Sequence, residues 1–149
     1  MKFKYLFLTL VLTAFLSSYM PNNGMLKEGS EAPAIERLDG RKENLRDGKT
    51  RLVSFWNPKN PSSRISNKRL SEFCSDSDVE FISICTDSDV ALMQEVLRMD
   101  DISTENALAY SDLSPRVFKD YGVEDHPAAF LISPKGKIEK ISQIGIGLN

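Results

Sequence analysis

Apolar residues along the chain gather in short runs separated by stretches with helical spacing. Two runs predict buried strands, residues 52–56 (Leu-Val-Ser-Phe-Trp) and residues 79–86, which are rich in β-branched and aromatic side chains. Residues 128–132 and 137–144 flank the sequence Ser-Pro-Lys-Gly-Lys, which has Pro and Gly where a turn needs them. We therefore expect two buried strands followed by a hairpin.

Three helices are predicted between these strands. The first runs from about Ser62 to Cys74. Its inward face would carry four residues: Ile65, Leu70, Phe73 and Cys74. The second follows the cap candidates in residues 87–89 and has an apolar stripe made of Val90, Met93, Val96 and Leu97. The third opens at Pro115 and ends at Tyr121, where Gly122 closes it.

The order strand, helix, strand, helix, helix, hairpin predicts an α/β fold, with a mixed sheet and helices on both of its faces. A chain of 149 residues that is 41% hydrophobic is long enough for one domain and too short for two. Neither internal repeats nor low-complexity tracts interrupt it. We expect one domain over residues 31–149, preceded by a polar linker over residues 19–30.

The N-terminus has the layout of a secretory signal over residues 1–18. A basic start, residues 1–4, precedes an apolar run, residues 5–16, and then two small residues, Ser17 and Ser18. The apolar run is shorter than the roughly 20 residues of a membrane-spanning helix. We expect an exported, periplasmic or otherwise extracytoplasmic protein, tethered to the membrane if the signal remains uncleaved.

Charge and cysteine content limit the chemistry. With 19 Lys and Arg against 21 Asp and Glu, the net charge is -2, which disfavours nucleic-acid binding. An oxidising compartment would permit a disulfide between Cys74 and Cys85. However, the predicted elements place the two at opposite ends of a strand, about 20 Å apart, and a disulfide needs Cα atoms within about 7 Å. We expect two small buried hydrophobes, with Cys85 the better candidate for a lone reactive thiol.

Three motifs, in this order, resemble the thioredoxin fold. They are EGSEAPAIERLDGRKENLRDGK (residues 28–49), LVSFWN (residues 52–57) and YGVEDHPAAFLISPKGKI (residues 121–138). The resemblance is narrowest to the redoxin branch, which holds alkyl hydroperoxide reductase and thiol-specific antioxidant proteins and cell-envelope thiol:disulfide oxidoreductases. It implies a three-layer α/β/α fold with a mixed central sheet. The helix that usually ends this fold is expected to be missing, because only Gly-Ile-Gly-Leu-Asn follows Ile144; the face it would cover could be bare, covered by the N-terminal segment or closed by a partner.

The chain departs from the redoxin pattern at the reactive site. Where the resemblance places a Cys-x-x-Cys pair, this chain has Asn60, Pro61, Ser62 and Ser63. Thiol chemistry there needs a thiolate that free backbone N–H groups and the positive helix end stabilise. An amide cannot replace it, and a serine hydroxyl would need an activating base. Asn at the N-cap followed by Pro is instead a good helix start.

A second region of the resemblance points to peptide binding. Pro127 matches the cis proline of the branch, which faces the helix start and lets the preceding main chain pair with an extended substrate segment. Such pairing needs no thiol. His126, the single histidine, could contact a ligand or simply fill the space of the missing cysteines, and alone it is a poor metal site.

Side chains around the same helix start have two interpretations each. The basic residues Lys59, Arg64 and Lys68 could hold an anion or a partner carboxylate, or form a solvated helix face. Trp56 could offer an aromatic platform, or simply pack.

These observations predict a redox-inactive, peptide- or protein-binding member of the redoxin branch in the cell envelope, without cofactor or metal. The expected groove comprises Trp56, Lys59, Asn60, Pro61, Ser62, Ser63, Arg64, His126 and Pro127. One alternative is a thiol:disulfide oxidoreductase or peroxiredoxin-like antioxidant that uses Cys85 or a partner's thiol. A second is a structural envelope subunit that uses an exposed sheet face.

Overall fold

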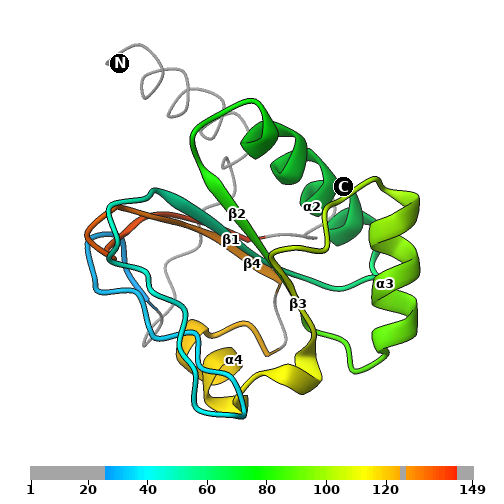
Figure 1. Ribbon diagram of the computed structural model, residues 1–149, viewed down its shortest axis with the longest axis horizontal. Coiled ribbons are helices and arrows are strands. Elements are labelled where there is room, and N and C mark those ends of the chain that lie inside the picture. The colour runs from blue at the N-terminus through cyan, green and yellow to red at the C-terminus, as the bar shows by residue number, and fades with distance from the viewer. Residues whose placement is uncertain (1–25, 125–126, 144–149) are drawn as a thin grey trace.

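The computed structural model describes residues 26–124 and 127–143, and in them a five-stranded sheet lies between helices (Figure 1). The elements are β1 (Arg51–Trp56), α2 (Pro61–Ser75), β2 (Glu80–Cys85), α3 (Val90–Met99), β3 (Ala107–Leu108), the 3-10 helix η1 (Tyr110–Asp112), α4 (Pro115–Tyr121), β4 (Ala128–Ile132) and β5 (Ile138–Gln143). The strand order is β3-β2-β1-β4-β5. Strands β1, β2 and β3 are parallel, whereas β4 is antiparallel to β1 and β5. The predicted α/β fold with a mixed sheet is confirmed.

Successive side chains of β1 point to opposite faces of the sheet, and each face is covered by helices. Leu52 packs with residues of α2 and Trp56 with residues of α3, so these two helices cover one face of the sheet. Val53 and Phe55 point the opposite way and pack with α4. All six residues of β1 are buried, as expected for a central strand covered on both faces.

Aromatic rings fill the core on the α4 side. The Phe55 ring lies 6.1 Å from that of Phe118, 4.9 Å from that of Tyr121 and 5.8 Å from that of Phe130, measured between centroids. The contacts with Phe118 and Phe130 are edge-on and that with Tyr121 is tilted, and aromatic pairs of this kind add to the stabilisation that comes from apolar burial. The Tyr121 hydroxyl donates to the carbonyl oxygen of Pro33 at 2.7 Å, and this bond fastens the N-terminal segment over the same core.

The segment that precedes β1 belongs to this layer. Ile35 and Leu45 are buried in the Phe55 core. Nearer the N-terminus, Gly29 N–H donates to the Ile138 carbonyl at 2.6 Å, and Ile138 N–H donates to the Ser30 carbonyl at 2.9 Å. The described end of the predicted linker is therefore hydrogen-bonded to β5.

The predicted signal and most of the predicted linker lie outside the described residues, as does the C-terminal segment 144–149 that bears on the missing final helix. Over the residues the structure does describe, no helix has the length and apolar character needed to cross a bilayer.

The fold differs from the sequence prediction at strand β3, at the 3-10 helix η1, which was not predicted, and at Ile65 of α2. Strand β3 was not predicted, because it is only two residues long and shows no alternation. On α2, Ile65 was expected to face inward but its exposed fraction is 52%. The inward positions near the start of this helix belong to Ser63, whose hydroxyl bonds the preceding loop, and to Asn67, whose Nδ2 lies 3.4 Å from the Ser83 hydroxyl of the sheet.

Candidate functional site at the start of helix α2

The loop between β1 and α2 is held by hydrogen bonds from its own residues. Asn60 caps the helix, since its Oδ1 accepts from Ser63 N–H at 3.0 Å, and Pro61 occupies the first helical position. In return, Ser63 Oγ accepts from Asn57 N–H at 2.9 Å. The predicted role of Asn60 as an N-cap is confirmed.

The four residues at the start of α2, from Asn60 to Ser63, differ in accessibility. Pro61 is exposed, Asn60 and Ser62 are half-buried, and Ser63 has no exposed surface. The Ser63 hydroxyl is engaged within the loop, so it is not presented to a substrate. This stretch therefore presents to a ligand a small, largely polar surface made of Asn60, Pro61 and Ser62.

Both cysteines of the chain are buried. Cys85 lies beside Trp56 in the parallel register, so it is at the loop side of the sheet, as predicted. It has no exposed surface, and its thiol donates to the Asp87 carbonyl oxygen at 3.4 Å. Burial raises the pKa of the Cys85 thiol to about 11 and that of Cys74 to about 12. Both are free thiols, which confirms the prediction that they form no bridge.

The basic residues around the helix start already have acidic partners. Lys59 Nζ lies 2.9 Å from Asp87 Oδ2. Arg64 donates two hydrogen bonds of 2.7 Å to the carboxylate of Asp100 at the end of α3. Lys68 Nζ lies 3.8 Å from a Glu72 oxygen one helical turn away. The alternative that these cations hold an external anion is therefore not supported. The parallel strand order brings Asp87 to Lys59, the packing of α2 beside α3 brings Asp100 to Arg64, and Lys68 has its partner Glu72 within α2.

Asp87 is the acidic partner closest to the loop. Its carboxylate accepts from Asp89 N–H at 2.8 Å as well as from Lys59. These two bonds, the backbone one first, lower the pKa of Asp87. The pair Lys59–Asp87 thus joins the loop after β1 to the loop after β2.

Trp56 is not an aromatic platform. Its exposed fraction is 1%, and the ring packs with residues of α3 such as Met93 and Leu97. Its carbonyl oxygen accepts from Thr86 N–H at 2.8 Å and from the Thr86 hydroxyl at 3.2 Å. Of the two interpretations of Trp56, packing is the correct one, because β1 is a central strand whose last residue is still covered by α3.

The strand register places Pro127 beside the helix start. Phe55 of β1 pairs with Ala128 of β4, so the half-buried Pro127 lies next to the end of β1, where the loop begins. The expected closeness of Pro127 to the loop follows from this pairing. His126 and the peptide bond between these two residues lie outside the described residues, so the expected cis bond and ligand contact stay predictions.

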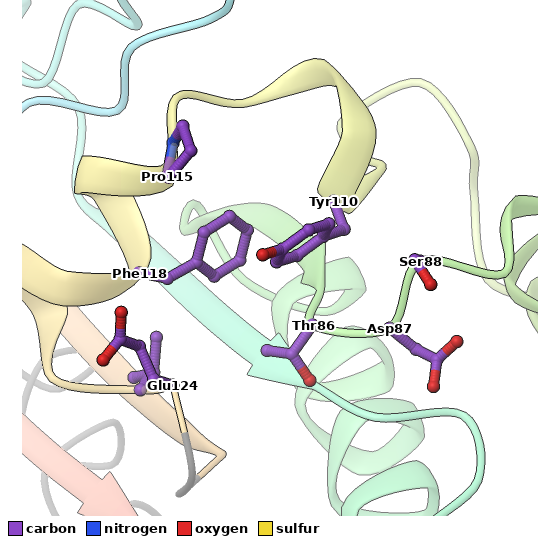
Figure 2. Close-up of a pocket in the computed structure, with 8 residues that line it drawn as sticks. Thr86, Asp87, Ser88, Tyr110, Pro115, Phe118 and Glu124 are labelled. Atoms are coloured by element: carbon purple, nitrogen blue, oxygen red, sulfur yellow. The ribbon is translucent and has the colours of Figure 1, made fainter.

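A pocket of about 410 Å³ lies alongside this loop region (Figure 2). Its lining comes from the loop after β2, from η1, and from α4 with the residues that follow it: Thr86, Asp87, Ser88, Tyr110, Pro115, Phe118, Val123 and Glu124. Asp87 belongs both to this pocket and to the ion pair with Lys59. Sequence reasoning missed the pocket; the only signals were an aromatic residue, Tyr110, inside a polar stretch, and an acidic residue shortly after Gly122.

A scan against protein-family models and a search of curated proteins found no match. Solved structures do match. A thioredoxin-like protein from Parabacteroides distasonis is 22% identical, with a TM-score of 0.67 over 79% of this chain and 88% of that one. The thioredoxin domain of a thiol-disulfide oxidoreductase from Bacteroides vulgatus is 23% identical, with a TM-score of 0.59 over 81% and 89%.

A third match is a thiol:disulfide interchange protein from a Bacteroides species, 27% identical with a TM-score of 0.58, which covers 78% of this chain and 81% of that one. The chain therefore has the thioredoxin-like fold. Its structural neighbours are thioredoxin-like thiol-disulfide oxidoreductases, in agreement with the resemblance to the redoxin branch.

Proposed function

We propose that this chain is an extracytoplasmic, redoxin-like protein that binds a protein or extended peptide and does not itself exchange thiols and disulfides. One observation carries the proposal: the start of α2 holds Asn60, Pro61, Ser62 and Ser63 in a closed hydrogen-bonded cap, with no sulfur. The solved neighbours are named as thiol-disulfide oxidoreductase and thiol:disulfide interchange proteins, which supports a polypeptide as the class of ligand.

The buried thiols support the redox-inactive part of the proposal. Exchange requires an accessible thiolate that attacks a disulfide sulfur. A thiol with a pKa of about 11, as for Cys85, is about one part in ten thousand thiolate at pH 7. In addition, Cys85 has no exposed surface through which a disulfide could reach it.

The binding part of the proposal uses the surface that remains beside the cap. An extended segment would pair with the main chain before Pro127 and lie across Asn60, Pro61 and Ser62. Main-chain pairing supplies affinity without a reactive group. The predicted signal over residues 1–18 would export the domain to the compartment that holds such a partner.

Binding of a carboxymethylated insulin B chain, measured by fluorescence anisotropy, tests this surface. Ser62→Tyr adds bulk at the helix start, and His126→Ala removes the side chain that precedes Pro127. Both are expected to weaken binding several-fold. Ser75→Tyr, at the exposed opposite end of the same helix, is the matched control and should bind as the parent does. If neither Ser62→Tyr nor His126→Ala weakens binding, the proposed surface is wrong.

A further inference from the structure

The pocket beside the loop presents an aromatic wall. Tyr110 has an exposed fraction of 39%, and its ring lies on that of Phe118 with centroids 4.6 Å apart and planes inclined by 35°. Phe118 itself is buried. Figure 2 shows the two rings side by side, with Thr86 and Glu124 below them in this view. The ring of Tyr110 is thus open to a ligand, and the buried ring of Phe118 packs against it.

The polar atoms of the pocket favour a ligand that donates hydrogen bonds. Thr86 gives its hydroxyl hydrogen to the Trp56 carbonyl oxygen at 3.2 Å, so the lone pairs of Thr86 Oγ1 are left to accept. Glu124 is exposed and has neither an ion-pair nor a hydrogen-bond partner within residues 26–124 and 127–143. The other carboxylate, that of Asp87, is already neutralised by Lys59.

Among the described residues that line the pocket, the charge is therefore that of one unpaired carboxylate, Glu124, next to an aromatic face. An anionic ligand would meet Glu124, and the described lining residues include no free cation to offset it. An apolar ligand would cover Glu124 and Thr86 and leave their acceptor oxygens without hydrogen bonds. A guanidinium group fits both features, because it is planar, stacks on aromatic rings and carries donors for the two acceptors.

We propose that this pocket receives an arginine side chain of the bound peptide, with the guanidinium group against Tyr110 and hydrogen-bonded to Glu124 and Thr86. The inference rests on the proposed function, since the peptide that lies across the helix start would reach the pocket past the Lys59–Asp87 pair. The expected partner is therefore an extended segment that carries a basic residue.

The test uses the full domain and a small probe, Nα-acetyl-L-arginine amide, followed by amide chemical shifts in a two-dimensional nitrogen–proton NMR titration. We expect shifts at Thr86, Tyr110 and Val123, and none with the neutral citrulline analogue. Glu124→Gln should weaken the probe about fivefold, as for a solvent-exposed ion pair. Tyr110→Ala should weaken it about threefold, whereas Tyr110→Phe keeps the ring and should not.

Glu105→Gln is the matched control, because Glu105 is an exposed acidic residue outside this pocket. Equal binding of the citrulline analogue, or an unchanged affinity in Glu124→Gln, would overturn the inference.

A peptide series separates this inference from the proposed function. If an extended peptide binds and replacing its arginine by citrulline weakens it in the parent but not in Glu124→Gln, both stand. If the peptide binds with no preference for arginine, the pocket assignment fails while the proposed function stands. If the probe binds the pocket but no extended peptide binds the domain, the proposed function fails, and so does the assignment to a peptide's arginine.

Discussion

Replacing Asn60 by alanine tests whether the loop after β1 is a structural cap. The substitution removes the Oδ1 that accepts from Ser63 N–H at 3.0 Å and leaves this donor without its partner. Loss of an N-cap typically costs about 1 kcal/mol, within a range of roughly 0.5–2 kcal/mol. Because Ser63 has no exposed surface, water replaces the lost acceptor poorly, and we expect about 1.5 kcal/mol.

The chain contains an intrinsic fluorescence probe for the unfolding measurement. Trp56 is the single tryptophan and is 1% exposed, so its fluorescence changes when the domain unfolds. Urea titration gives the free energy of unfolding, with an unchanged dependence on denaturant if only stability is affected. In a thermal scan the same loss lowers Tm by about 5 °C for a domain of this size.

Asn60→Asp is the matched control, since it keeps an acceptor oxygen and places a negative charge at the positive end of α2. It should be at least as stable as the parent at neutral pH. The reasoning is refuted if Asn60→Ala unfolds at the parent's urea midpoint, or if Asn60→Asp loses as much stability as Asn60→Ala.

Three further predictions follow from other contacts. In a double-mutant cycle, Arg64→Ala and Asp100→Ala should show a favourable coupling of about 0.5–1 kcal/mol, kept small because Arg64 is 32% exposed and solvent screens the pair; additive losses would contradict it. Hydrogen bonding to Arg51 lowers the pKa of Asp47 to about 2, so its contribution is present above the unfolded pKa near 3.8 and is lost as pH falls toward 2. The stability gap between the parent and Asp47→Asn should thus close between pH 4 and pH 2, and a gap that closes only above pH 5 would refute the assignment. A thiol reagent at pH 8 should label the two buried cysteines only as fast as the domain opens, and rapid stoichiometric labelling of the folded protein would show an accessible thiol.

The sequence predicts most of the fold because the core elements carry strong local signals. The apolar runs that became β1, β2 and β4 are central strands, buried nearly throughout, so their composition is decided by the interior. The bounds of α4 were also predictable, since Pro115 is favoured at the first position of a helix and Gly122 ends it in the left-handed conformation, with φ of 66°.

The errors in the fold prediction have a common cause, namely tertiary contacts that local sequence patterns do not report. Ile65 was assigned inward from periodicity, yet the sheet beneath α2 presents the hydroxyls of Ser54 and Ser83, so Asn67 faces inward and Ile65 faces solvent. Strand β3 forms because β2 offers it a parallel partner at Ser83 and Ile84, not because its own two residues favour a strand.

The candidate site was only partly predictable for a related reason. The N-cap at Asn60 is local and was found. The ion pairs were not, because Lys59 and Asp87 are 28 residues apart and Arg64 and Asp100 are 36 apart. The pocket combines three separate segments of the chain, so no stretch of sequence predicts it alone.

The central claim is that a thioredoxin-like domain without accessible sulfur has no thiol-disulfide exchange of its own. Insulin reduction in the presence of dithiothreitol tests it most directly, with an active thiol:disulfide oxidoreductase as the positive control. We expect this protein to reduce insulin no faster than dithiothreitol alone, with no difference in Cys85→Ser. Sustained turnover above that background, abolished in Cys85→Ser, would contradict it.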